Sequence, residues 1–300
     1  MQKTMLVTGA TGFTGRWIAR QGKQLGIRLV GTSFSKAVPD ADYPELYACD
    51  LTDKSSIEAV LAQVKPDYVL HLAAISFVAH GSVQDIYQTN LVGTVNLLDA
   101  IKTTCPAVQK VLVASSGNVY GNSAELPITE RTQLSPVNDY AVSKVAMEYA
   151  CRSRMADLPI IITRPFNYTG IGQAEHFLLP KIVAAFKRQQ TVLELGNLDV
   201  ARDFTDVRDL ATAYLKLVES NVDSEEFNLC SGKPVNLMQV IEMMQRITGF
   251  KLGVQVNPAF VRSNEVKQLY GSEDKLRAVI GDYRHYTDLE DTLAWMYSSK

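Results

Sequence analysis

Short apolar runs alternate with longer amphipathic stretches through the first half of the chain, a pattern typical of strands and helices in turn. The predicted strands are 4–8, 28–32, 46–49, 68–74, 111–115 and 160–163, and the predicted helices are 13–25, 55–64, 82–103 and 138–155. Strands that alternate with helices in this way form a parallel sheet with helices on both faces. We therefore predict an α/β fold with a doubly wound Rossmann sheet.

The second half of the chain follows a less regular pattern. It predicts helices over 177–188, 207–219 and 236–248, a strand over 226–229 and a loop-rich stretch over 249–271. No repeat or flexible linker is visible, so we predict a smaller mixed α/β lobe that packs on the sheet as a lid. We assign residues 1–167 plus about 203–230 to the Rossmann domain, and about 168–202 plus 231–300 to the smaller lobe.

Composition argues against several classes of protein. The net charge of -2 over 300 residues gives no general attraction to nucleic acid or to an anionic membrane. No apolar run reaches the ~18 residues of a membrane span, and the first residues lead into a strand, not a signal peptide. The four cysteines form no C-x-x-C pair, and the four histidines show no metal-ligand spacing. We expect a cytoplasmic protein with reduced cysteines and no metal.

A glycine-rich loop follows the first predicted strand and opens the first helix. Its glycines, Gly9, Gly12 and Gly15, follow the spacing G-x-x-G-x-x-G, with Thr11 and Phe13 between them. Glycine permits a tight turn and a close backbone approach, and a helix N-terminus attracts a pyrophosphate. The order of strand, loop and helix therefore predicts a dinucleotide site.

The end of the second strand indicates which dinucleotide binds. NAD-binding folds usually place an acid there for the ribose hydroxyls. This chain has no acid at that point, but it has the hydroxyls of Ser33 and Ser35 and the ammonium of Lys36. These groups suit a 2′-phosphate, so we favour NADPH, with NADH possible. Lys36 could equally be a solvated loop charge.

Tyr140 and Lys144 lie four residues apart in a predicted helix, so their side chains share one face. An ammonium group beside a phenol favours the phenolate, so we expect Lys144 to lower the pKa of Tyr140. A tyrosine of lowered pKa can exchange a proton with a substrate oxygen. The pair alone is weak evidence, because many surface helices contain it by chance.

Taken together, these motifs resemble the extended short-chain dehydrogenase/reductase family, also called the NAD-dependent epimerase/dehydratase family. The match rests on the glycine loop, Asp50-Leu51, His71-Leu72-Ala73-Ala74, Asn90, Ser115-Ser116, the Tyr140/Lys144 pair and Arg164-Pro165-Phe166-Asn167. The resemblance implies an NAD(P)-dependent oxidoreductase whose catalytic residues are Ser116, Tyr140 and Lys144. It further implies cofactor contacts from Asp50, Leu51, Ala73, Ala74, Asn90, Tyr140, Lys144 and Arg164. For Asp50, a helix cap near Thr52 is the alternative.

Further motifs resemble the branch of this family that acts on GDP-mannose derivatives. They are Leu195-Gly196-Asn197, Arg202-Asp203-Phe204-Thr205-Asp206 and Arg262-Ser263-Asn264-Glu265. The branch contains 4,6-dehydratases and reductases of GDP-4-keto-6-deoxy-hexoses. It implies a GDP-linked sugar held by Ser76, Asn118, Asn167, Arg202, Arg262 and Glu265. Arginine forks suit phosphate oxygens, but Arg202 and Arg262 could also be ordinary ion pairs.

One position favours the reductases over the dehydratases. A dehydratase of this branch removes a C5 proton with a glutamate two residues before a Tyr-Gly pair. Here the pair is Tyr120-Gly121 and the position holds Asn118, whose amide cannot abstract a proton. The resemblance therefore implies reduction of a C4 ketone, closest to the reductases of GDP-6-deoxy-D-lyxo-4-hexulose that yield GDP-D-rhamnose, or its C4 epimer. In that reaction Tyr140 would donate the proton and Ser116 would bind the same oxygen.

Three other interpretations remain open at this stage. The chain could be a GDP-mannose 4,6-dehydratase or a nucleotide-sugar epimerase, the second of which needs further acid/base groups such as a Cys/His pair with His176. It could instead be a non-catalytic NAD(P)-sensing protein, although such proteins lose the Tyr/Lys pair.

The resemblance also implies a homodimer that pairs through the helices beginning at Ser82 and Asn138.

Overall fold

A seven-stranded sheet forms the base of the molecule in the computed structural model, which describes residues 2–34, 38–76, 82–261, 265–286 and 288–299. Its order is β10-β6-β5-β4-β1-β2-β3, and every neighbouring pair is parallel. The strands are β1 (Thr4–Thr8), β2 (Arg28–Ser33), β3 (Leu46–Ala48), β4 (Tyr68–His71), β5 (Lys110–Ala114), β6 (Ile160–Pro165) and β10 (Glu225–Leu229). The order reverses between β1 and β4, which is where such sheets bind their ligands.

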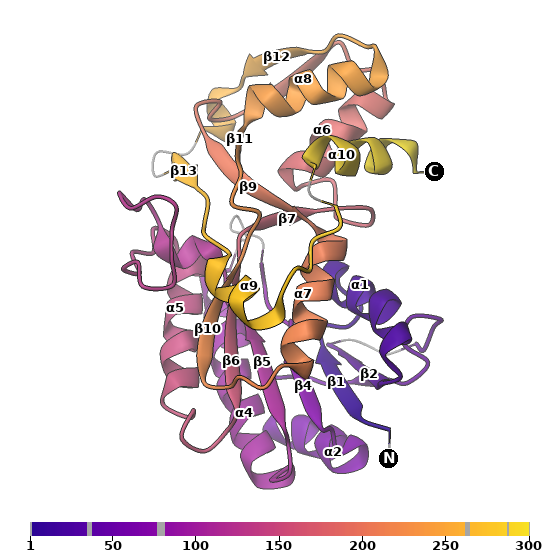
Figure 1. Cartoon of the computed structure of the whole chain (residues 1–300), viewed down its shortest axis with the longest axis vertical. Helices are drawn as coiled ribbons and strands as arrows, with labels where there is room; N and C mark the ends of the chain where they lie inside the picture. Colours follow the sequence, from indigo (N-terminus) through magenta and orange to yellow (C-terminus); the bar gives the residue numbers. More distant parts are fainter. Residues whose placement is uncertain (1, 35–37, 77–81, 262–264, 287, 300) are drawn as a thin grey trace.

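Helices cover both faces of this sheet (Figure 1). One face carries α1 (Phe13–Gly22), α7 (Val207–Glu219) and α9 (Asp274–Ile280), and the other carries α2 (Lys54–Val64), α4 (Gly93–Thr104) and α5 (Asp139–Arg152). Each face buries its own apolar cluster, because strands buried on both sides present apolar residues in both directions. The predicted doubly wound α/β fold is confirmed.

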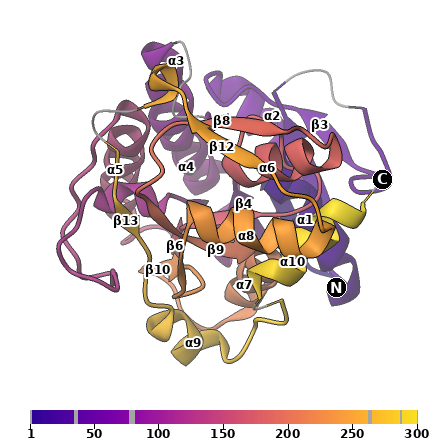
Figure 2. The same ribbon diagram turned by 90° about the horizontal axis from the view of Figure 1, so that it is seen from above.

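A smaller lobe lies over the carboxyl ends of the strands (Figures 1 and 2). Its sheets consist of β7 (Asn167–Thr169), β9 (Ala201–Asp206), β11 (Pro234–Asn236) and β13 (Gln268–Leu269), and separately of β8 (Val192–Leu195) and β12 (Gly253–Val256). Its helices are α6 (Leu178–Lys187), α8 (Leu237–Thr248) and α10 (Leu289–Ser298), which bury a third apolar cluster. These short strands escaped prediction, because each is stabilised by partners distant in sequence.

The long helix predicted over 82–103 is interrupted. Ser82 caps α3 (Val83–Tyr87) by accepting a hydrogen bond from the Asp85 backbone N–H, as its capping signal predicted. A π-helical segment over Gln88–Val92 then precedes α4. Such segments alter the direction of side chains and are frequent at functional sites.

The chain passes between the two lobes several times. It enters the second lobe at β7, whose first residue is Asn167, passes through α6 and β8, and leaves this lobe after Asp206 at the end of β9. It then returns to the large sheet through α7 and β10. The division predicted at residues 167 and about 203 remains our proposal, with the return placed after Asp206. No helix within the described ranges is long and apolar enough to cross a bilayer.

Candidate active site

A cleft of about 2200 Å³ lies at the carboxyl ends of the strands, with walls from both lobes. Drug-sized ligands occupy pockets of roughly 300–1,000 Å³, so this space exceeds what one such ligand needs. The large sheet contributes the glycine loop and the residues after β4 and β5. The second lobe contributes residues of α6, β8 and β9.

The glycine loop is built for close approach to a ligand. Gly9 has φ +68°, and a Cβ there would lie 2.9 Å from the Ala73 backbone. A Cβ on Gly15 would lie 2.5 Å from the Ala10 carbonyl oxygen. Gly12 begins α1 without a side-chain cap, and the first turn carries no acid. The positive end of the helix dipole therefore faces the cleft beside Thr11 and Phe13, which fits a pyrophosphate.

The end of the cleft that would hold the adenosine ribose is polar. Strand β2, which ends there, carries no carboxylate. Thr32, Ser33 and Phe34 line this end of the cleft, and Phe34 is 79% exposed. Ser35 and Lys36 lie outside the described residues, so their predicted role remains a prediction. The described end of β2 therefore offers no acid to bind the two ribose hydroxyls.

Asp50 and Leu51 also line the cleft, after β3. The Asp50 carboxylate accepts hydrogen bonds from the Thr52 backbone N–H at 2.8 Å and from its hydroxyl at 2.7 Å. It therefore fixes a turn, and the cap of α2 is Asp53 instead. The predicted adenine contact and the turn-forming role are compatible, because only one of the carboxylate oxygens is used in these bonds.

The loop after β4 brings Ala73, Ala74 and Ser76 to the cleft, but Asn90 does not reach it. Asn90 is fully buried, accepts from the Ile75 N–H at 2.8 Å, and donates to the Ile75 carbonyl and to Ser143 Oγ, both at 3.1 Å. We correct the prediction that Asn90 touches the cofactor. From the π-helical segment, it holds the backbone of Ile75, beside the cleft residues Ala74 and Ser76.

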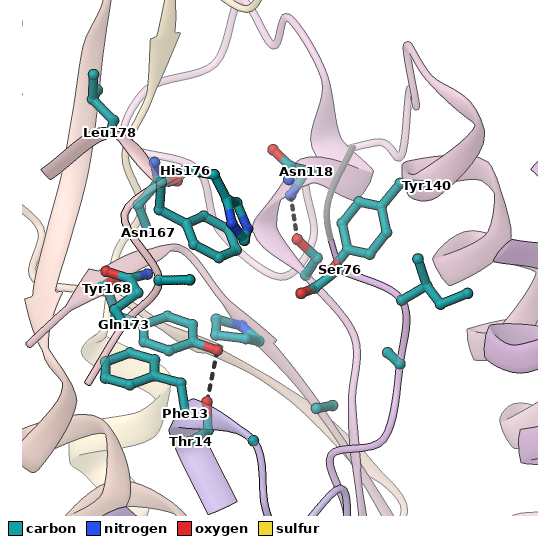
Figure 3. Close-up of a pocket in the computed structure, with 18 of the residues that line it drawn as sticks. Phe13, Thr14, Ser76, Asn118, Tyr140, Asn167, Tyr168, Gln173, His176 and Leu178 are labelled. Carbon is teal, nitrogen blue, oxygen red and sulfur yellow. Dashed lines mark hydrogen bonds between the residues drawn. The ribbon is translucent and has the colours of Figure 1, made fainter. Parts of the chain in front are cut away.

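Ser116, Tyr140 and Lys144 all line the cleft. Ser116 follows β5, and the other two project from the first turns of α5, which Asn138 caps by accepting a hydrogen bond from the Ala141 N–H at 2.9 Å. The Ser116 hydroxyl bonds the Tyr140 phenol. Figure 3 shows Ser76, Asn118 and Tyr140 on one side of the pocket and Asn167, Tyr168 and His176 on the other.

The pKa of Tyr140 differs from the prediction. Burial raises it to about 12, opposed by the hydrogen bond from Ser116. Lys144 Nζ donates to the Ala114 carbonyl at 2.7 Å, and burial lowers the pKa of Lys144 to about 8. The expectation that Lys144 lowers the pKa of Tyr140 is wrong for this structure, because desolvation of the phenol is the largest influence on it and favours the neutral form. Tyr140 is therefore a neutral phenol at pH 7, ready to donate a proton.

Arg164 is also placed differently from the prediction. Its side chain is 1% exposed and does not line the cleft. It donates to both carboxylate oxygens of Glu148, from Nε at 2.9 Å and from Nη2 at 2.7 Å, and to the Tyr120 hydroxyl at 2.8 Å. We correct its predicted cofactor contact: Arg164 is a buried structural cation.

The predicted substrate residues lie in the outer part of the cleft. Asn118, Asn167, Arg202 and Glu265 all line it. Arg202 forms an ion pair with Glu265 and donates to two backbone carbonyls, so its fork is oriented by the protein. Arg262 falls outside the described residues.

Tyr168 also lines the cleft, although no sequence motif predicted it there. Its hydroxyl and the Thr14 hydroxyl are 2.9 Å apart, and its ring stacks on Phe13 with centroids 5.9 Å apart (Figure 3). This contact joins the glycine loop to the second lobe. His176 lines the cleft as well, whereas Cys49 is the only one of the four cysteines, all described, to do so. Cys49 lies beside Asp50 at the ribose end, so the Cys/His pair of an epimerase is not assembled.

Comparison with known proteins agrees with this geometry. Residues 5–230 match the family model described as "NAD dependent epimerase/dehydratase family". The chain is 32% identical to GDP-6-deoxy-D-talose 4-dehydrogenase of Aggregatibacter actinomycetemcomitans, over 99% of this chain and 97% of that protein. It is 34% identical to GDP-6-deoxy-D-mannose reductase of Pseudomonas aeruginosa, over 94% and 92%. The structure of RMD from Pseudomonas aeruginosa complexed with NADPH superposes with a TM-score of 0.85, at 31% identity over 99% and 97% of the two chains.

The chain belongs to the NAD-dependent epimerase/dehydratase family, so the resemblance stated from sequence is confirmed. It is an NAD(P)-dependent enzyme that acts on nucleotide sugars, as an oxidoreductase or epimerase at sugar C4.

Proposed function

We propose that the protein reduces the C4 ketone of a GDP-linked 4-keto-6-deoxy-hexose. The observation that carries this proposal is a neutral, buried phenol bonded to a serine hydroxyl, beside an amide at residue 118. Such a site can protonate an alkoxide, and Asn118 supplies no base for the C5 proton. Two curated relatives named above act on GDP-6-deoxy-hexoses, which supports the same substrate class.

Tyr140, Ser116 and Lys144 have different proposed roles in the reaction at C4. Tyr140 gives its phenolic proton to the oxygen that becomes the hydroxyl, while Ser116 donates a hydrogen bond to the same oxygen. Lys144, held by the Ala114 carbonyl, places a cation near the phenolate that remains. Bound NADPH supplies the hydride. The glycine loop would hold its pyrophosphate and the Ser33 region its 2′-phosphate.

We favour NADPH over NADH for two reasons. The described end of β2 contains no carboxylate, and a relative at 31% identity has been solved with NADPH. We propose that the ion pair of Arg202 and Glu265, together with Asn167, binds the diphosphate and the nucleoside ribose of the sugar nucleotide. Ser76 and Asn118 line the cleft on the same side as Tyr140 and are proposed to bind the sugar (Figure 3).

The product is the point on which the relatives differ. Reduction from one face of the ketone gives GDP-D-rhamnose, and reduction from the other gives GDP-6-deoxy-D-talose. The two curated relatives carry names for these two configurations at C4, at 34% and 32% identity. We propose GDP-D-rhamnose first, with its C4 epimer as the alternative.

The test is to incubate the protein with NADPH and freshly made GDP-4-keto-6-deoxymannose, following absorbance at 340 nm and the product by NMR. We expect NADPH to be consumed and an equatorial C4 hydroxyl to form. NADH in place of NADPH measures the cofactor preference. Parallel incubations with GDP-mannose and UDP-glucose test the dehydratase and epimerase alternatives. Cofactor binding without turnover of any sugar would favour a sensing protein.

The predicted homodimer remains a proposal. Apolar side chains are exposed along α3, the π-helical segment and α5: Val83 at 47%, Val92 at 36%, Val142 at 37% and Tyr149 at 62%. These elements contact one another in the fold, so their exposed side chains can form one continuous surface. A second copy of the chain is the proposed partner.

A further inference from the structure

Three side chains of α5 contact three consecutive residues at the end of β5. Tyr140 bonds the Ser116 hydroxyl, Lys144 donates to the Ala114 carbonyl, and Glu148 accepts from the Ser115 hydroxyl at 2.6 Å. Positions 140, 144 and 148 are spaced by four, so they form one stripe along the helix. Two of the three contacts belong to the proposed catalytic residues, and the third has no assigned role.

We propose that Glu148 is a positioning residue for catalysis, which sets the register of α5 against β5 and so places Tyr140 and Lys144 beside Ser116. The proposal rests on the function argued above, because it concerns the same catalytic trio. Glu148 itself lies outside the cleft, so it acts through the contacts it makes and not on the substrate.

The partners of Glu148 explain how it can fix a register. Its side chain is fully buried and accepts from Ser115 of the β5 end, from Arg164 of β6 and from Arg152 of its own helix at 3.2 Å. The three donors belong to three parts of the fold: the end of β5, strand β6 and helix α5. A buried carboxylate with three donors cannot move without losing charge-assisted hydrogen bonds, which are strong in a low dielectric.

The same residue influences the charge of Lys144. Lys144 is surrounded by Glu148 and Cys151 on α5, by the neutral imidazole of His71 on β4 and by the Ala114 carbonyl. Burial lowers the pKa of Lys144 to about 8, while Cys151 and Glu148 oppose that fall. Loss of the Glu148 charge would therefore make Lys144 neutral at a lower pH.

Three variants test the proposal. Ser115→Ala removes one contact and leaves every charge in place. Glu148→Gln removes the carboxylate charge. Glu148→Gln/Arg164→Met removes the buried ion pair without leaving an uncompensated cation, so it should fold where the single variant fails. The matched control is Asp209→Asn, because Asp209 is also a buried carboxylate but accepts from the backbone N–H groups of His285 and Tyr286, which belong to neither β5 nor α5.

We expect kcat for ketone reduction to fall about tenfold or more in the double variant and several-fold in Ser115→Ala, with KM nearly unchanged. In Glu148→Gln, the fall of kcat at alkaline pH should begin at a lower pH than in the wild-type protein. NMR of ¹³C-labelled lysine, with Lys144 assigned through Lys144→Arg, should show a lower pKa for Lys144 in Glu148→Gln without any need for turnover. Asp209→Asn should lower Tm but leave the pH profile in place.

The proposal is overturned if Ser115→Ala and the double variant, both folded, keep the wild-type kcat and merely lose Tm, as Asp209→Asn does. It is also overturned if the pKa of Lys144 does not fall in Glu148→Gln. An inactive wild-type protein would instead count against the proposed function. In that case the NMR titration still decides the effect of Glu148 on Lys144.

Discussion

At the scale of single residues, burial decides what Tyr140 can do. An exposed tyrosine beside a lysine would lose its proton more easily, but this phenol is buried and its pKa rises to about 12. The proposed reduction needs a proton donor, and a neutral phenol is one across the whole physiological range. The pair is therefore suited to donating a proton first and stabilising the phenolate afterwards.

Replacing Tyr140 with phenylalanine keeps the ring and removes only the proton. We expect kcat for ketone reduction to fall by about 10²–10⁴-fold, the usual contribution of a general acid, while the Kd for NADPH changes little. Stopped-flow reduction and fluorescence titration of NADPH measure the two quantities. Tyr149→Phe is the matched control on the same helix, because Tyr149 is 62% exposed. Undiminished turnover in Tyr140→Phe would exclude this residue as the acid.

At the scale of elements, the glycine loop and the π-helical segment shape the cofactor site together. The loop approaches the chain after β4 so closely that the Ala73 backbone leaves no space for a Cβ atom on Gly9. Asn90 in the π-helical segment binds both polar backbone groups of Ile75, two residues further along. Strand β4 ends at His71, earlier than predicted, because the next residues serve the cleft and not the sheet.

Gly9→Ala tests this close packing. The new methyl group would lie 2.9 Å from the Ala73 backbone at a φ of +68°, so the loop must shift. We expect the Kd for NADPH to rise at least about tenfold and the free energy of unfolding to fall by about 1–3 kcal/mol.

Gly26→Ala is the control for Gly9→Ala. Gly26 has a similar φ of +65°, but nothing lies within 4 Å of its Cβ position. In Gly26→Ala, backbone strain alone should lower the free energy of unfolding by about 1 kcal/mol, and NADPH binding should be unchanged. Equal losses of affinity in both variants would mean that general destabilisation, not the shape of the loop, weakens binding. Denaturant unfolding and fluorescence titration provide the measurements.

At the scale of the whole molecule, three aspartates on and beside β9 tie distant segments together. Asp203 accepts from both the N–H and the hydroxyl of Ser231 at 2.6 Å and from the Gly232 N–H at 2.8 Å. Asp206 accepts from the Thr292 hydroxyl at 2.8 Å, and Asp209 binds the backbone at 285–286. The short segment that contains Arg202 thus holds the C-terminal third of the chain against both lobes.

Asp203→Asn should weaken this attachment. An amide can accept fewer of these hydrogen bonds and places an N–H group among donors, so we expect a loss of about 2–4 kcal/mol in the free energy of unfolding. Since Arg202 is the neighbouring residue, KM for the sugar nucleotide should also rise. Thermal unfolding and steady-state kinetics measure both, with the exposed Asp199→Asn as control. A stable Asp203→Asn protein would show that the other contacts suffice.

The sequence alone determined the features that depend on neighbours along the chain. Glycine spacing predicted the tight loop between β1 and α1, a capping signal predicted the start of α3 at Ser82, and helical spacing placed Tyr140 and Lys144 on one face. Apolar periodicity predicted the strands of the large sheet except for their ends. These features are local, because turn geometry, capping and helix periodicity act within a few residues.

Only the tertiary structure decided which side chains are buried and what they meet there. It placed Arg164 and Glu148 in one buried ion pair, moved Asn90 from the cofactor to the loop beside it, and raised the pKa of Tyr140 where its lysine neighbour suggested a fall. It also paired short strands such as β7 and β9. Desolvation and partner choice depend on groups far apart in the sequence, and no local pattern records them.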